Sequence, residues 1–179
     1  MPGSVRPSGL LDGRIPALAF SYRRRNNVMR LPEGFSLRLA RVDEAALVRD
    51  VMLRCWTGTV AANSSAYRET VEDIAGQIAR GGAVLLFLGG EAVGGGRFHP
   101  VPGPVGDARP WAEIKRVGVM REQRKLGLGA PLAVALEDAA RAAGAVGAQL
   151  GVRENQPRLV RFWASLGYRV ANDVPFVPG

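Results

Sequence analysis

A basic run with two glycines, Arg124 to Gly129, comes directly before an expected helix over residues 130–143. Glycine lets backbone N–H groups approach a ligand closely, and the N-terminus of a helix attracts negative charge. A diphosphate is therefore the natural ligand of this segment. Its spacing matches neither a P-loop, which ends in Gly-Lys-Ser/Thr, nor a dinucleotide-binding loop, which needs a third glycine where Leu132 stands. Taken alone, the run could equally be a turn that starts a helix.

The composition excludes several classes of protein. The chain has 179 residues, enough for one domain, and its 47% hydrophobic and 22% charged residues are typical of a globular protein. Its longest apolar run, residues 83–88, is far shorter than the roughly 20 residues that span a bilayer. One cysteine, Cys55, and one histidine, His99, allow neither an internal disulfide nor a Cys/His metal cluster. We expect a cytoplasmic protein with no metal and no membrane association, in which Cys55 is a buried core thiol.

The net charge of +8 is concentrated near the N-terminus. Residues 1–41 hold eight Arg against Asp12 and Glu33. Residues 1–33 are also rich in Pro and Gly, which predicts a basic N-terminal extension, dispensable for activity, before one domain over residues 34–179. The apolar stretch 15–20 could dock as an edge strand or form part of a homodimer interface. An Arg-rich tail can contact nucleic acid or acidic lipid, but a solvated extension is the simpler interpretation.

Hydrophobic periodicity predicts the elements that position these residues. Alternating or continuous apolar runs predict strands over 35–39, 83–88, 92–98, 112–119 and 148–152, and from 168 up to 176. The helical period predicts helices over 43–56, 70–81, 130–143 and about 157–166. Thr70 with Asp73 is typical of a capping box. If adjacent, the strands that flank helix 130–143 must be parallel, so we expect an α/β domain with a central mixed sheet and about four helices.

Three segments of the chain resemble the GNAT superfamily of acyl-CoA N-acyltransferases. Residues 124–129 match its Arg/Gln-x-x-Gly-x-Gly/Ala signature. Residues 112–119 resemble its fourth strand, and residues 156–163 with Leu166-Gly167-Tyr168 resemble its last helix and Gly-aromatic ending. The resemblance covers roughly residues 35–170.

The resemblance implies a site for acetyl-CoA. The pyrophosphate would rest on backbone amides between Leu126 and Ala130, with Arg124 and Lys125 as neighbouring cations. The pantetheine arm would pair with residues 117–119, in a gap between the fourth and fifth strands, and an amide near Val119 would stabilise the oxyanion. The cofactor-binding residues implied in this way are Val117, Gly118, Val119, Arg124, Lys125, Leu126, Gly127, Leu128, Gly129, Ala130, Phe162 and Trp163.

The implied reaction is direct transfer of an acetyl or short acyl group to a primary amine of a small molecule or peptide, without a covalent enzyme intermediate. Two positions depart from the family pattern. Trp163 stands where many members have a Tyr that protonates the leaving thiolate, and an indole N–H is too weak an acid for this. Either solvent protonates the thiolate, or Trp163 only packs on the pantetheine. Gln156 stands at a frequent Asn position, beside Asn155.

An ammonium substrate must lose a proton before it attacks, and two residues are candidates for the base. Glu113, on an expected strand, could accept the proton through water; equally, it could pair with Lys115 or Arg116. His99, expected just past the preceding strand, has an ordinary pKa of about 6.5 but could be a plain loop residue.

The loop after the first helix is expected to set acceptor specificity. It offers Trp56, Asn63, Ser64, Ser65 and Tyr67, and has no acidic cluster for a polyamine or aminoglycoside. It could also be a plain capped connection. Two other functions stay open: a non-catalytic acyl-CoA-binding module, suggested by Trp163, and a nucleic-acid-associated protein that uses the Arg-rich tail but has no recognisable reader motif.

Overall fold

The computed structural model describes residues 17–21, 29–60, 64–152 and 156–174. These residues form a seven-stranded sheet in the order β2-β3-β4-β5-β6-β1-β7. Its strands are β1 (Ala17–Ser21), β2 (Phe35–Leu39), β3 (Gly82–Leu88), β4 (Glu91–Val101), β5 (Trp111–Val119), β6 (Gly147–Gly151) and β7 (Arg169–Ala171). The α-helices are α1 (Ala45–Trp56), α2 (Val71–Arg80), α3 (Gly129–Ala142) and α4 (Pro157–Ser165), and short 3-10 turns are η1 (Val42–Glu44), η2 (Ser65–Arg68) and η3 (Arg121–Leu126).

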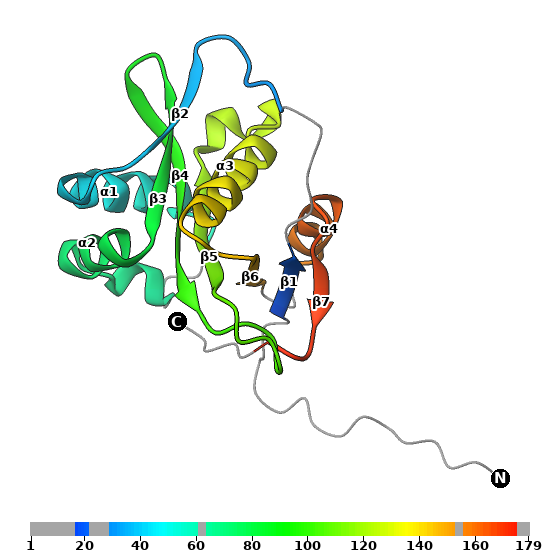
Figure 1. Ribbon diagram of the computed structural model, residues 1–179. Coiled ribbons are helices and arrows are strands. Elements are labelled where there is room, and N and C mark those ends of the chain that lie inside the picture. The colour runs from blue at the N-terminus through cyan, green and yellow to red at the C-terminus, as the bar shows by residue number, and fades with distance from the viewer. Residues whose placement is uncertain (1–16, 22–28, 61–63, 153–155, 175–179) are drawn as a thin grey trace.

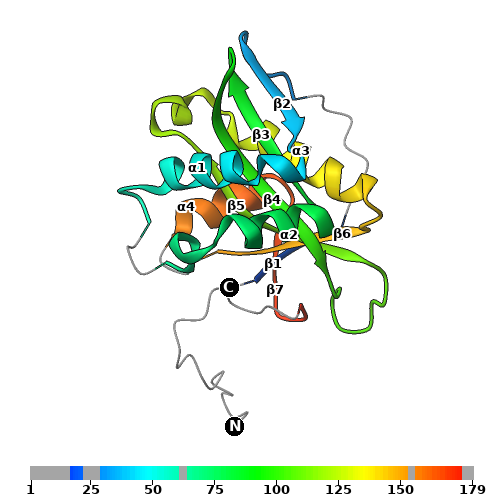
Figure 2. The ribbon, with the colours of Figure 1, turned by 90° about the vertical axis from the view of Figure 1, so that its left-hand side faces the viewer.

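Helices cover both faces of the sheet. α1 and α2 lie against β4 on one face, and α3 packs on β3, β4 and β5 on the opposite face (Figures 1 and 2). The buried core between these layers is almost entirely apolar, with Val51, Leu86 and Leu136 fully buried. The expected mixed sheet with four α-helices is therefore confirmed.

Several local predictions are confirmed. The β3–β4 hairpin is antiparallel, and β5 and β6, which flank α3, are parallel. Thr70 Oγ1 accepts a hydrogen bond from the Asp73 amide at 3.1 Å, and Asp73 Oδ2 accepts one from the Thr70 amide at 3.0 Å, which completes the capping box at the start of α2. Asp43, in contrast, lies within η1 and does not cap α1.

The expectation that residues 1–33 lie outside the domain does not hold for β1. Residues 17–21 pair antiparallel with both β6 and β7, so this strand lies inside the sheet and not at its edge. Leu18 and Ala19 are each only 1% exposed. The partners of β1 are more than a hundred residues further along the chain, which local periodicity cannot reveal. Residues 1–16 and 22–28 of the expected extension are outside the described residues.

The β4–β5 pair is irregular beside the middle of β5. Its register shifts between Gly95 and Arg97, and Arg116 opposite has φ +59°, in the left-handed region that a non-glycine residue rarely adopts. These features define a β-bulge, which turns side chains away from strict alternation. Gly96 is required here because a Cβ would lie 2.6 Å from Leu136 Cδ1 of α3.

Two strand ends differ from the prediction. β4 continues to Val101, so His99 lies within a strand and not past its end. β7 ends at Ala171, whereas the sequence allowed it to reach Phe176, which is outside the described residues. His99 pairs across the ladder with Glu113 of β5. The longer β4 therefore brings the two candidate bases together.

Candidate active site

A cleft of about 430 Å³ opens between β5 and β6. These strands pair only at Ala112 with Ala148 and at Glu113 with Gln149, and beyond these residues they separate. The cleft is lined by Trp56, Val60, Ser64, Ser65, Glu113, Ile114, Lys115, Arg116, Val117, Gly118, Val119, Gly129, Leu150, Gly151, Val152, Gln156, Leu159, Phe162 and Trp163. It thus lies between two strands, where the resemblance implied a gap.

The backbone of β5 is available along this cleft. β4 pairs with one edge of β5 as far as Val119, whereas β6 pairs with the other edge only at residues 112 and 113. Within the described part of the chain, the β6-side edge of residues 114–119 therefore has no strand partner. Unpaired N–H and C=O groups on a strand edge can bind an extended, amide-containing ligand.

The cleft ends at the start of α3. Gly127 has φ +72°, which allows the chain to turn from η3 into α3, and Gly129 begins the helix. N–H groups in the first turn of a helix have no intrahelical acceptor, so they and the helix dipole favour an anion. A Cβ on Gly129 would lie 3.4 Å from Phe162 Cζ, so a larger side chain would project between α3 and α4.

The predicted cofactor residues fall into two groups. Those that line the cleft are Val117, Gly118, Val119, Gly129, Phe162 and Trp163. Arg124, Lys125, Leu126, Gly127, Leu128 and Ala130 lie outside its lining, in the adjoining η3–α3 segment. Leu128 is fully buried, so its side chain belongs to the core.

Arg124 connects two elements of the fold. Its Nε donates to the Val119 carbonyl at 3.0 Å, and its Nη2 donates to the Cys55 carbonyl at the end of α1. The guanidinium is therefore engaged with backbone, whereas Lys125 is exposed beside the same helix N-terminus. Cys55 itself is 1% exposed, and burial raises the pKa of its thiol to about 11, so at neutral pH it is a thiol and not a nucleophilic thiolate.

Glu113 and His99 form a contact pair. His99 Nε2 lies 3.1 Å from Glu113 Oε2, and Lys115 Nζ lies 4.0 Å from the same oxygen. Burial, with the nearby cations Lys115, Arg80 and Arg97, lowers the pKa of His99 to about 4. His99 is therefore neutral at pH 7, with its Nε2 beside the carboxylate. Burial raises the pKa of Glu113, which makes this carboxylate a stronger base than an exposed one.

Three of the side chains expected to set acceptor specificity lie at the cleft. Trp56, Ser64 and Ser65 line it. Tyr67 does not: its hydroxyl lies 3.2 Å from the Trp56 carbonyl and 3.4 Å from the Val60 carbonyl, to which it donates. Tyr67 thus holds the loop in place. Asn63 and Asn155 lie outside the described residues.

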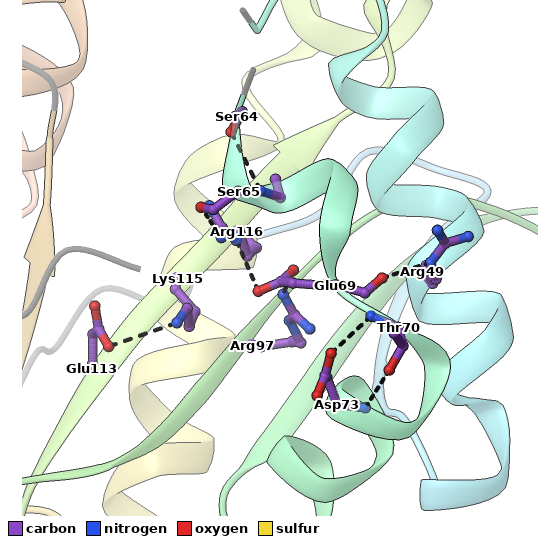
Figure 3. A network of polar contacts seen from close by, with 11 residues as sticks. Arg49, Ser64, Ser65, Glu69, Thr70, Asp73, Arg97, Glu113, Lys115 and Arg116 are labelled. Atoms are coloured by element: carbon purple, nitrogen blue, oxygen red, sulfur yellow. Dashed lines mark hydrogen bonds and ion pairs between the residues drawn. The ribbon is translucent and has the colours of Figure 1, made fainter. Parts of the chain in front are cut away.

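A polar network beneath this loop was missed by sequence reasoning (Figure 3). Glu69 follows η2 and contacts two guanidiniums, with its Oε2 2.5 Å from Arg97 Nη2 and its Oε1 3.3 Å from Arg116 Nε. Arg116 Nη2 also donates to Ser65 Oγ at 3.0 Å, and the guanidinium lies 5.5 Å from the centre of the Trp56 ring. The available signal was Arg97 itself, a charged residue directly after three glycines in an apolar hairpin.

Trp163 packs in the core and does not present an acidic group. It is 6% exposed, and its ring makes edge contacts with Phe162 and Tyr168, each with ring centroids 5.1 Å apart. Gln156 lines the cleft directly before α4 without a side-chain hydrogen bond that caps this helix.

The described residues contain no group of three or more His, Cys, Asp or Glu side chains that could hold a metal ion. Among the helices they form, none is long and apolar enough to cross a membrane.

Comparisons with known proteins agree with this geometry. Residues 46–168 match the model of the Acetyltransferase (GNAT) family. A GCN5-related N-acetyltransferase structure from Ralstonia eutropha is 16% identical, with a TM-score of 0.63 over 80% of this chain and 98% of that one. One from Kribbella flavida is 24% identical, with a TM-score of 0.57 over 88% of this chain and 54% of that one.

A Drosophila protein structure is 14% identical, with a TM-score of 0.61 over 88% of this chain and 48% of that one. The chain thus spans about half the length of the Drosophila and Kribbella flavida proteins. At these identities, the similarity to solved structures shows the fold alone. No curated protein sequence matches the chain.

Proposed function

The chain belongs to the Acetyltransferase (GNAT) family, and we propose that it transfers an acetyl or other short acyl group from acyl-CoA to a primary amine. The main support for this proposal is the cleft between β5 and β6. An unpaired strand edge, a helix N-terminus and a partly buried carboxylate all border this cleft. Each of these features matches one part of the reaction.

The residues of the cleft fit acetyl-CoA. The β6-side edge of residues 114–119 would hold the amide-containing pantetheine arm, because that edge is paired only at residues 112 and 113. The first turn of α3 and exposed Lys125 would hold the pyrophosphate. When bound, acetyl-CoA supplies the acyl group as a thioester. An N–H near Val119 would stabilise negative charge on the acyl oxygen.

Glu113 is the residue we assign to proton removal. It lines the cleft, whereas His99 does not. The raised pKa of Glu113 suits a base that takes a proton from an ammonium group through water. His99 has a pKa of about 4, and its Nε2 lies 3.1 Å from Glu113 Oε2, so we assign it the role of positioning that carboxylate.

Trp163 has no acidic hydroxyl like that of Tyr, so we assign protonation of the departing thiolate to solvent. The cleft is open to water on its acceptor side, where Ser65, Lys115 and Arg116 are only partly buried. Water is a sufficient proton donor for a thiolate, since the ordinary pKa of a thiol is only about 8.5.

The proposal is tested by thiol release from acetyl-CoA in the presence of amino acids, polyamines, aminoglycosides and peptides with a free N-terminus. Release above the rate without protein, with formation of the N-acetylated product, is the expected result. A protein that binds acetyl-CoA but releases no thiol with any amine would instead be the non-catalytic acyl-CoA-binding module. A salt-dependent shift of duplex DNA without CoA binding would favour the nucleic-acid function.

A further inference from the structure

The acceptor side of the cleft carries two adjacent cations on one face of β5. Lys115 pairs across the ladder with Arg97, and Arg97 and Arg116 both contact Glu69. Lys115 and Arg116 therefore point to the same face although they are consecutive, which a regular strand forbids. The bulge at Arg116, with φ +59°, produces this arrangement. A strained non-glycine residue in a cleft indicates a functional constraint.

Positive charge exceeds negative charge in this cluster. Lys115, Arg97 and Arg116 face two carboxylates, Glu69 and Glu113. Glu69 is shared by both guanidiniums. Of the described groups beside the cluster, His99 is neutral and the Arg49 guanidinium binds the Glu69 carbonyl at 2.8 Å, so neither adds negative charge.

Hydrogen-bond donors are also in excess. Arg97 is 1% exposed, and its Nε and Nη1 have no hydrogen-bond partner among the described residues. Glu69 lies closer to Arg97 than to Arg116, at 2.5 Å against 3.3 Å. Arg116 also donates to Ser65 Oγ, and of the two guanidiniums it is the one that lines the cleft. An anionic group of the ligand beside Arg116 and Lys115, which line the cleft, would balance the excess positive charge.

We propose that the acyl acceptor is an amino acid, an amine that also carries a carboxylate, and that Arg116 binds this carboxylate with Ser65 and Lys115 beside it. This rests on the proposed function. The amine then lies toward Glu113, on the same face of the same strand (Figure 3). Arg116 determines specificity and takes no part in proton transfer. Polycationic acceptors are disfavoured by the same excess of positive charge.

The test uses matched amines in the thiol-release assay with acetyl-CoA. Glycine, β-alanine and L-phenylalanine are compared with methylamine, ethylamine and phenylethylamine, which lack only the carboxylate. The values of kcat/KM are expressed per free amine, so that differences in amine pKa do not enter. We expect at least about a tenfold preference for one or more of the amino acids over its partner, as loss of a charge-assisted contact allows.

The matched variants are Arg116→Gln and Arg54→Gln. Arg116→Gln leaves Glu69 paired with Arg97, and Arg54 pairs with Asp50 and Glu91 outside the cleft lining. Arg116→Gln should remove the preference by raising KM for the amino acid, with little change for its decarboxylated partner. Arg54→Gln should keep it. Equal use of both amines, or a preference that survives Arg116→Gln, would overturn the proposal while leaving acyl transfer intact.

A second measurement does not depend on turnover. In the presence of CoA, calorimetry compares N-acetylglycine, N-acetyl-β-alanine and N-acetyl-L-phenylalanine with their carboxamides. Tighter binding of an acid than of its amide, lost in Arg116→Gln, supports the carboxylate site even if no thiol is released. Equal binding of acids and amides, or no binding of either in a protein that releases no thiol, contradicts it.

Discussion

The two walls of the cleft are built in different ways. The β5 wall belongs to a run of antiparallel strands, β2 to β5, in which each strand pairs with the next one along the chain. This wall carries the charged groups Glu113, Lys115 and Arg116. The β6 wall joins β5 at two positions and is paired on its other side by β1, from the start of the chain. It contributes Leu150, Gly151 and Val152.

This difference separates the groups that bind and react from those that shape the cleft. The β5 wall provides both a backbone edge and the side chains that can handle protons and bind charge. The β6 wall, with α4, provides mostly apolar surface and the separation that keeps the cleft open. Damage to the β6 wall should therefore act through stability, and damage to the β5 wall through turnover or acceptor choice.

The largest expected effect follows from loss of β1. In the described sheet β7 pairs with β1 alone, and Leu18 is 1% exposed. Leu18→Ala should lower the free energy of unfolding by about 2–5 kcal/mol, and removal of residues 1–21 by more. Urea unfolding measures this. Val170→Ala, at a side chain that is 55% exposed, is the control and should change little. If the truncated protein is as stable as the full chain, β1 is a dispensable extension.

Glu113→Gln should have the next largest effect. It should lower kcat by about 10- to 1000-fold, because proton removal from the amine loses its base. The loss should shrink toward about pH 9.5, where free amine is more plentiful. Steady-state kinetics from about pH 6 to 9.5 measure it. His99→Gln, the comparison variant, should have a much smaller effect; the reverse order would transfer the role of base to His99.

Gly129→Val should weaken CoA binding by at least about tenfold, or ~1.4 kcal/mol. The new side chain would project from the first turn of α3 toward Phe162, at the end of the cleft. Calorimetric titration with CoA measures the affinity. Gly90→Val is the control, because nothing lies within 4 Å of a Cβ at that hairpin turn. Weakening of the same size in both variants would contradict a local effect.

Lowering the pH should change the free energy of unfolding through His99. His99 has a pKa of about 4 in the folded protein and about 6.5 in an unfolded chain. Between these values the unfolded chain binds more protons, so stability is lost as the pH falls from about 6.5 to about 4. His99→Gln removes this contribution. Urea unfolding across that range should show a shallower loss in His99→Gln than in the wild type, and parallel curves would refute the lowered pKa.

The structural features that could be predicted from the sequence are those that depend on residues close together in the chain. The capping box at Thr70, the β3–β4 hairpin and the parallel pair around α3 each follow from local patterns. β1 could not be predicted in this way, because a five-residue strand with partners near residues 150 and 170 leaves no periodic signal.

The site was predictable in outline and not in its contacts. Trp56, Ser64, Ser65 and Glu113 all line the cleft, and the roles given to them stay predictions. The contact between His99 and Glu113 depends on how far β4 extends, and the contact of Arg116 with Glu69 depends on a bulge. Both depend on register, which side-chain types alone do not fix.

The most direct test of the division between binding and chemistry measures CoA affinity and kcat together in Glu113→Gln and Gly129→Val. We expect opposite losses in the two variants: Glu113→Gln loses turnover with nearly unchanged CoA affinity, whereas Gly129→Val loses CoA affinity. Unchanged CoA affinity in folded Gly129→Val, or normal turnover in Glu113→Gln at about pH 7 where the amine is mostly protonated, would contradict it.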